Sequence, residues 1–105
     1  NRLKETLLGV RRSTLEVHGA VSAQTAREMV DGIRRITGAT AALSVTGIAG
    51  PSGGSPDKPV GTVWIGAALE ETVEVRNFVF VGTRKDIRER SAQAALALLL
   101  RLLRR

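Results

Sequence analysis

The chain has 105 residues, 43% hydrophobic and 25% charged, which is the composition of one small globular domain and excludes a disordered or collagen-like chain. It contains no cysteine, which excludes disulfides and thiolate metal sites and favours a reducing compartment, so we expect a cytoplasmic protein. The net charge is +6, and the longest apolar run, Ala94 to Leu100, is far shorter than the roughly 20 residues that span a bilayer, so we expect no membrane contact.

The first long helix is predicted over residues 22–36, after a short amphipathic segment, Arg2–Leu8. Ser22 is placed to cap its N-terminus, and Gly38 is placed to end it. The apolar residues of this segment recur at helical spacing: Ala26, Met29, Val30, Ile33 and Ile36.

Three strands and one long loop follow this helix. Residues 47–61 contain five glycines and all three prolines of the chain, which predicts a loop. Glu70-Glu71 joins two strand-like runs, so we expect an antiparallel hairpin there. The end of the hairpin, Phe78 to Val81, is apolar on both faces and is expected to be covered from both sides. The predicted strands are Ala41–Val45, Thr62–Leu69 and Thr72–Val81.

A second long helix is predicted from a Thr83 cap to about Leu103. One apolar stripe runs along it: Ile87, Ser91, Ala94, Ala95, Leu98 and Leu102. Further leucines widen the apolar face, so we expect this helix to pack on more than one neighbour: Leu96, Leu99, Leu100 and Leu103.

The order of elements predicts an α/β fold with a mixed sheet. Three strands and two long helices make a thin core for this length. The extended leucine faces therefore suggest that missing sheet or a second subunit covers them, and we expect a homo-oligomer.

The excess positive charge is concentrated at one end of the chain. Residues 84–105 carry seven basic and two acidic side chains, which accounts for +5 of the net +6. The aromatic residues Trp64, Phe78 and Phe80 all lie in strand-like runs, so no stacking platform for single-stranded bases is predicted. We therefore do not expect nucleic acid as a partner.

The long loop is the most informative stretch for function. The strand before it runs directly into glycines, so main-chain N–H groups can approach a ligand there. The loop is neither a Walker loop nor a dinucleotide fingerprint. A plain connection is the alternative, but a loop this long in so small a domain favours a function.

Several motifs in chain order resemble one known family. Thr46-Gly-Ile-Ala-Gly-Pro, Gly53-Gly54 and Lys58-Pro-Val-Gly-Thr-Val-Trp64 are similar to the signature of the C-terminal domain of the competence/damage-inducible CinA proteins, the nicotinamide-nucleotide amidase family. Further segments resemble the same family, with Thr83 standing where Asp is common: Asn1-x-x-Lys4, Leu8-Gly-Val10, His18-Gly-Ala-Val-Ser22, and Gly82-Thr-Arg84 with Arg88 and Ala94-Ala-Leu96.

The resemblance covers residues 1–105 and implies the C-terminal two-thirds of that domain. It implies a three-layer α/β/α arrangement with a mixed sheet, here without the N-terminal strands and helices. The implied reaction is hydrolysis of the carboxamide of nicotinamide mononucleotide to nicotinic acid mononucleotide and ammonia. No metal or cofactor is implied, and His18, the only histidine, is expected to be structural.

The family is thought to use a serine nucleophile with a lysine as its base, and Lys4 matches that lysine. As an alternative, Lys4 is a solvated charge on its amphipathic segment. The family's serine lies upstream of the lysine in a Glu-Ser-Cys-Thr-Gly-Gly segment, which this sequence lacks. We therefore expect the chain alone to be inactive and marginally folded. The alternative function is a non-catalytic nucleotide-binding or oligomerisation remnant.

Five further residues have supporting roles in this interpretation. The Thr46 hydroxyl and the N–H groups of Gly47 and Ile48 are candidates to hold the substrate amide or its oxyanion. Alternatively, Thr46 only caps the strand end. Arg84 and Arg88, one turn apart at the start of the last helix, are candidates to bind the nucleotide phosphate. For this pair the alternative is an ordinary solvated helix face.

Overall fold

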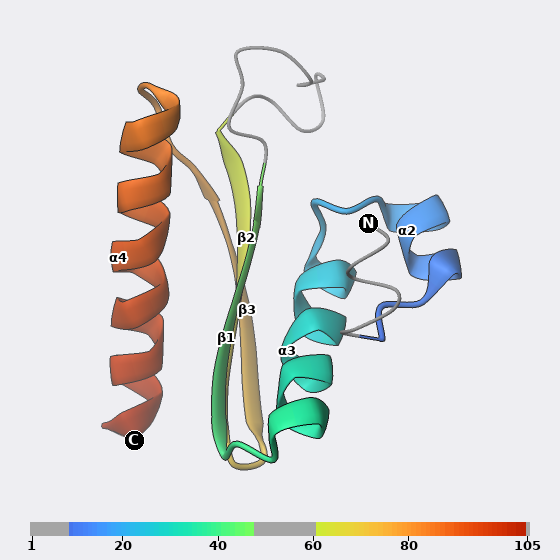
Figure 1. Cartoon of the computed structure of the whole chain (residues 1–105). Coiled ribbons are helices and arrows are strands. Elements are labelled where there is room, and N and C mark those ends of the chain that lie inside the picture. The colour runs from blue at the N-terminus through green and yellow to red at the C-terminus, as the bar shows by residue number, and fades with distance from the viewer. Residues whose placement is uncertain (1–8, 48–60, 105) are drawn as a thin grey trace.

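The computed structural model of the chain describes residues 9–47 and 61–104, so the segment Arg2–Leu8 lies outside the described residues. Helices cover both faces of one central sheet, α3 on one side and α4 on the other, and α2 packs against α3 on the side away from the strands (Figure 1). The three-layer α/β/α arrangement is therefore confirmed. The elements are α2 (Arg12–His18), α3 (Ala23–Thr37), β1 (Ala41–Gly47), β2 (Thr62–Leu69), β3 (Thr72–Val79) and α4 (Arg84–Leu103).

The sheet has three strands in the order β1-β2-β3, and both pairings are antiparallel. Ala67 of β2, for example, lies opposite Leu43 of β1 and Glu74 of β3. The expected mixed sheet is therefore wrong for the described strands. Parallel neighbours need a crossover, usually through a helix, whereas each strand here pairs with its neighbour in the sequence.

The ends of both long helices are fixed as the sequence predicts. Ser22 Oγ accepts a hydrogen bond from the Thr25 amide at 3.2 Å, and Gly38 ends α3 in a left-handed conformation at φ 70°. At α4 the Thr83 hydroxyl accepts from the Asp86 amide, and the Asp86 carboxylate accepts from the Thr83 amide, which together form a capping box. The hydrogen bond from the Thr83 amide to the carboxylate, together with the Thr83 side chain, lowers the pKa of Asp86. Both predicted helices are thus confirmed to within a residue or two.

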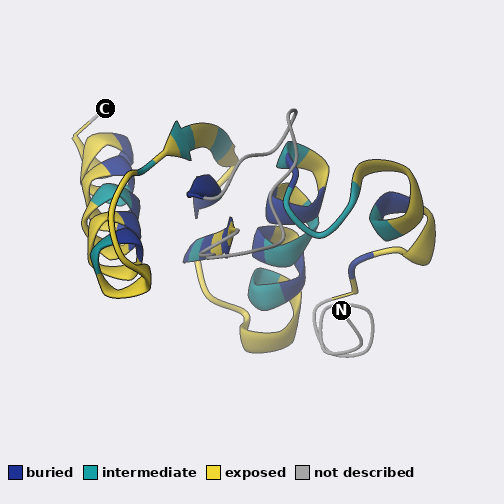
Figure 2. Cartoon of the chain, turned by 90° about the horizontal axis from the view of Figure 1, so that it is seen from above, coloured by how far each residue is buried: buried dark blue, intermediate teal, exposed yellow. Residues whose placement is uncertain are grey.

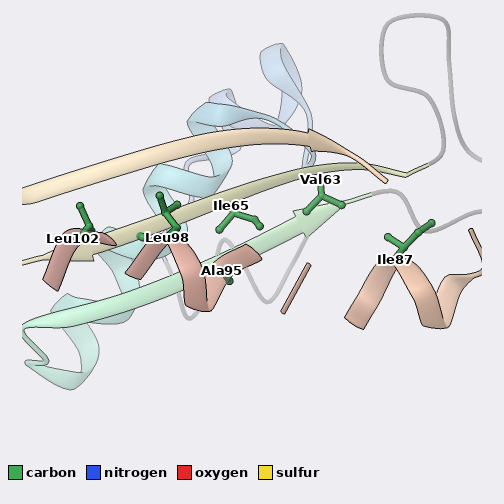
Figure 3. Packing of buried hydrophobic residues seen from close by; sticks show 7 residues of the cluster. Val63, Ile65, Ile87, Ala95, Leu98 and Leu102 are labelled. Atoms are coloured by element: carbon green, nitrogen blue, oxygen red, sulfur yellow. The ribbon is translucent and has the colours of Figure 1, made fainter. Parts of the chain in front are cut away.

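The core lies mainly between the sheet and α4. Val63, Ile65 and Ala67, alternate residues of β2, face the predicted stripe of α4 (Figure 3). On the other face of the sheet a smaller cluster packs against α3: Val30, Ala42 and Ala68. The helix residues in the main cluster are Ile87, Ala95, Leu98 and Leu102.

Two expectations about coverage differ from the structure. Val79 and Val81 are 57% and 78% exposed, so the end of the hairpin is not covered from both sides by the described residues. The reason is that β3 is an edge strand of the described sheet. Likewise, α4 packs on the sheet alone within the described ranges, and Leu96, Leu100 and Leu103 each stay about half exposed.

The short helix α2, which the sequence analysis did not predict, is held to α3 by a polar cluster around Glu28. The Glu28 carboxylate accepts hydrogen bonds from the Thr14 hydroxyl at 2.6 Å and from the Arg11 amide at 2.8 Å, and it pairs with the Arg11 guanidinium at 3.3 Å. Partial burial raises the pKa of Glu28, but these hydrogen bonds outweigh it and leave the pKa below its ordinary 4.5.

We predict that this cluster makes the domain acid-sensitive. A lowered pKa means that Glu28 stabilises the fold fully above pH 4.5 and loses this contribution as the pH falls through the lower pKa of the folded state. Glu28→Gln should therefore flatten the dependence of the unfolding free energy on pH in that acid range, measured by urea unfolding. An unchanged pH dependence in Glu28→Gln would contradict this role.

No helix in the described ranges is both long enough and apolar enough to serve as a membrane-spanning segment.

Candidate functional site

A cavity opens between the carboxyl end of β1, the start of β2 and the first half of α4. Its volume is about 290 Å³. It therefore lies at the point where the predicted loop leaves the sheet, although that loop, residues 48–60, is outside the described residues. The lining residues are Val45, Gly47, Val63, Ile87, Arg88, Ser91 and Ala92.

The cavity is apolar except for two side chains, Arg88 and Ser91. The Ser91 hydroxyl is buried and donates to the Ile87 carbonyl at 2.6 Å, so its proton is already engaged. Within residues 9–47 and 61–104, no carboxylate pairs with the exposed Arg88 guanidinium. A guanidinium beside an apolar wall suits a ligand with an apolar ring and an anionic group.

Strand alternation decides which β1 residues reach this cavity. Val45 and Gly47 face α4, whereas Ser44 and Thr46 between them face α3. At Gly47 a Cβ atom would lie 2.9 Å from Val63 Cγ2 and 3.0 Å from the Thr62 carbonyl oxygen. A larger residue would therefore push against β2, and glycine lets the two strands approach at the mouth of the cavity.

Thr46 lies on the opposite face of the sheet from the cavity. Its side chain is buried, and its hydroxyl donates to the Ala20 carbonyl at 2.7 Å. The same turn is held by the Thr25 and Ser22 hydroxyls, which donate to the Gly19 carbonyl at 2.7 and 2.9 Å. The structure thus places Thr46 where it joins the end of β1 to the turn before α3, and its predicted role at the substrate amide stays a prediction.

The other predicted site residues are distributed as follows. Arg88 and Gly47 line the same cavity. Arg84 is the first residue of α4, exposed and one turn before Arg88. Lys4 and Ile48 lie outside the described residues. The structure therefore brings together Gly47 and Arg88 of the predicted set.

The apolar walls of this site were not predicted from the sequence. Val45, Val63 and Ile87 carry no chemical motif, and their only signal was the alternation of β1 and β2 and the stripe of α4. His18 ends α2 and is exposed. Over the part of the chain that the structure describes, no three His, Cys, Asp or Glu residues gather where a metal ion could be held.

Comparison with known proteins places this geometry in context. Residues 1–103 match the family described as the CinA C-terminal domain. A putative competence-damage inducible protein of Thermoanaerobacter pseudethanolicus is 50% identical over 103 residues, 98% of this chain and 25% of that protein. A CinA-like protein of Thermotoga maritima is 51% identical over 96 residues, 91% of this chain and 23% of that protein. The chain thus spans about a quarter of the length of these curated relatives.

Solved structures share the fold, and this chain covers a larger share of them than of the curated relatives. The competence/damage inducible protein CihA of Agrobacterium tumefaciens superimposes with a TM-score of 0.93 and 39% identity, over 97% of this chain and 63% of that one. The competence damage-inducible protein A of Klebsiella pneumoniae gives a TM-score of 0.89 and 37% identity, over 94% of this chain and 62% of that one.

Proposed function

Because this chain belongs to the family of CinA C-terminal domains, we propose that it forms the nucleotide-binding part of a domain that hydrolyses nicotinamide mononucleotide. In this reaction water cleaves the carboxamide C–N bond, which gives nicotinic acid mononucleotide and ammonia. The chain corresponds to about 60% of the solved relatives and would supply the C-terminal two-thirds of the catalytic domain.

The observation that supports this proposal most strongly is the position of Arg88 at the edge of an apolar cavity. The walls formed by Val45, Val63 and Ile87 suit a planar pyridine ring. The Arg88 guanidinium suits the phosphate, because its fork of N–H groups can bind two phosphate oxygens at once. A volume of about 290 Å³ is close to the lower end of small-ligand sites, so the ring and the ribose would nearly fill it.

The remaining roles in this proposal rest on the family resemblance. Lys4 is the general base for a serine nucleophile, and Arg84 assists Arg88 at the phosphate. Gly47 and Ile48 position the amide and its oxyanion through their main-chain N–H groups, and Thr46 acts indirectly by fixing the end of β1 to the turn before α3. The serine comes from the Glu-Ser-Cys-Thr-Gly-Gly segment of the family, which is not present in these 105 residues.

A second candidate function is a non-catalytic nucleotide-binding or oligomerising module. The hydrogen bond made by Ser91 favours this non-catalytic function for the 105-residue chain. Ser91 carries the hydroxyl that lines the described part of the cavity. It donates to the Ile87 carbonyl, and its described contacts include no histidine or lysine that could act as a base and activate it as a nucleophile. On this interpretation the chain binds the nucleotide and leaves it intact.

We expect a calorimetric titration of nicotinamide mononucleotide into this chain to give saturable heat, with no ammonia released in a parallel assay. A chain that gives no saturable heat would contradict nucleotide binding altogether. Release of ammonia would instead show that the chain has its own nucleophile and would reject the non-catalytic alternative. In a longer relative that carries the serine segment, replacing the lysine equivalent to Lys4 by alanine should abolish ammonia release.

A further inference from the structure

The outer side of α4, turned away from the sheet, carries a row of leucines. Leu96, Leu100 and Leu103 are 57%, 49% and 56% exposed. The opposite side of the helix packs on the sheet, as Figure 2 shows by the dark blue inner side and yellow outer side of α4. Because the leucines point away from the described sheet, no strand of that sheet can cover them. An ordinary surface helix would have polar residues at these positions.

These leucines belong to a regular pattern. Together with the exposed Glu89 and Gln93 they are spaced by four, three, four and three residues. This is the spacing of the contact positions in a coiled coil, where each apolar side chain inserts between residues of a facing helix. We call these five residues the outer stripe: Glu89, Gln93, Leu96, Leu100 and Leu103.

We propose that the outer stripe binds the outer stripe of a second copy of this chain, with the two α4 helices antiparallel. In the register that pairs the most apolar residues, Leu96 lies beside Leu100 of the second copy, and Leu103 lies beside Gln93 of the second copy. Both copies then bury the same leucines, as a two-fold interface requires.

Charge along the helix decides the orientation. In a parallel pair each Glu89 would face Glu89 of the second copy, and the two Arg104 side chains would lie together, which is unfavourable. In the antiparallel register the two Glu89 side chains are separated, and Arg104 lies within about one helical turn of both Glu89 and Arg90 of the second copy, so the orientation is decided by the removal of the Glu89–Glu89 contact. Glu89 pairs with Lys85 of its own chain at 3.9 Å, but both side chains are mostly exposed. This pair is therefore weak and leaves Glu89 able to contact the second copy.

The helix pair is short, so we expect a dimer that depends on concentration rather than an obligate one. Sedimentation equilibrium should be run up to about 1 mM chain, where an association of only about 4 kcal/mol is half complete. The unmodified chain should shift toward dimer over this range. A chain that remains monomeric at the highest concentration would overturn the proposal.

Charge substitutions on the stripe test which surface is used. The double variant Leu96→Glu, Leu100→Glu should remain monomeric, and because both positions are exposed its circular dichroism should match that of the unmodified chain. Val17→Glu is the matched control, since Val17 is 75% exposed on α2, far from the stripe. The control should dimerise as before. A double variant that still dimerises would show that another surface is responsible.

Cysteine cross-linking tests the orientation, and the chain has no cysteine of its own to interfere. In the antiparallel register a mixture of Leu96→Cys and Leu100→Cys chains should form a disulfide-linked heterodimer under mild oxidation. Either variant alone should cross-link poorly, because identical residues are offset by about 6 Å along the axis, which carries their Cα atoms beyond the roughly 7 Å reach of a disulfide. Efficient cross-linking of each variant with itself would indicate a parallel pair and contradict the proposal. These experiments need no nucleotide, so their outcome is independent of the proposed function.

Discussion

Replacing Gly66 by valine is expected to abolish cooperative unfolding of this domain, and replacing it by alanine to lower the unfolding free energy by about 1–3 kcal/mol. A Cβ atom at Gly66 would lie 2.7 Å from Ser44 Oγ, 3.0 Å from the Ala26 carbonyl oxygen and 3.0 Å from a methyl group of Val30. The neighbours cannot easily yield, because the Ser44 hydroxyl donates to that Ala26 carbonyl at 2.8 Å and so holds β1 against α3. Urea unfolding followed by circular dichroism measures the loss.

A double variant separates crowding from other effects of the substitution. At an open strand position, glycine to alanine would stabilise the fold by roughly 0.5–1 kcal/mol. Ser44→Ala removes the atom nearest to the new Cβ, so the loss in Ser44→Ala, Gly66→Ala should be smaller than the sum of the two single losses by about 0.5 kcal/mol or more. Additive losses, or a more stable Gly66→Ala, would show that α3 does not pack closely on β2 at this point.

Arg88→Ala is expected to weaken the binding of nicotinamide mononucleotide by about ten- to a hundredfold, because hydrogen bonds to charged groups contribute about 1.5–3 kcal/mol each. Arg88→Lys should recover only part of the affinity, since an ammonium group cannot bind two phosphate oxygens in the same forked geometry. Isothermal titration calorimetry on the three chains at one salt concentration gives these ratios directly.

Two controls make the result specific to the phosphate. Arg27→Ala removes an exposed arginine from α3, on the other side of the sheet, and should leave the affinity unchanged. Nicotinamide riboside, which lacks the phosphate, should bind the unmodified chain and Arg88→Ala equally. Equal weakening of riboside and mononucleotide would mean that Arg88 shapes the cavity rather than binds the phosphate.

Local chemistry explains which parts of the fold could be predicted from sequence. Ser22 and Gly38 fix the ends of α3, and Thr83 fixes the start of α4, because caps depend on the residues next to them. The β2–β3 hairpin was predicted from two strand-like runs separated by two residues and is confirmed, although its turn lacks an Asn-Gly signal. Glu70 takes the required positive φ of 54°, and the Arg34 guanidinium donates to its carbonyl from α3.

The errors arose where partners are distant in the sequence. Helix α2 depends on Glu28, which lies beyond the next turn, and its own seven residues give little helical pattern. The mixed sheet was wrong for the described strands because strand direction is set by pairing rather than by propensity. Coverage of β3 and α4 was overestimated, since apolar residues such as Val79 indicate a tendency to be buried without identifying a neighbour.

The candidate site also has features that the sequence predicts and features that depend on contacts between distant segments. Gly47 and Arg88 were selected by motif and lie together, because the end of β1 and the second turn of α4 meet at one edge of the sheet. Thr46 belongs to the same motif, but strand alternation turns it toward Ala20 on the opposite face. A motif specifies which residues occur together in the sequence, whereas the fold decides which of their side chains share a cavity.

The position of the ligand tests the proposed site most directly. In a heteronuclear NMR titration of the chain with nicotinamide mononucleotide, we expect the largest saturable shifts at the amides of Gly47, Val63, Arg88 and Ala92, with the α3 amides unaffected. Shifts confined to α3, or scattered over the basic surface without saturation, would contradict a nucleotide site between β1 and α4.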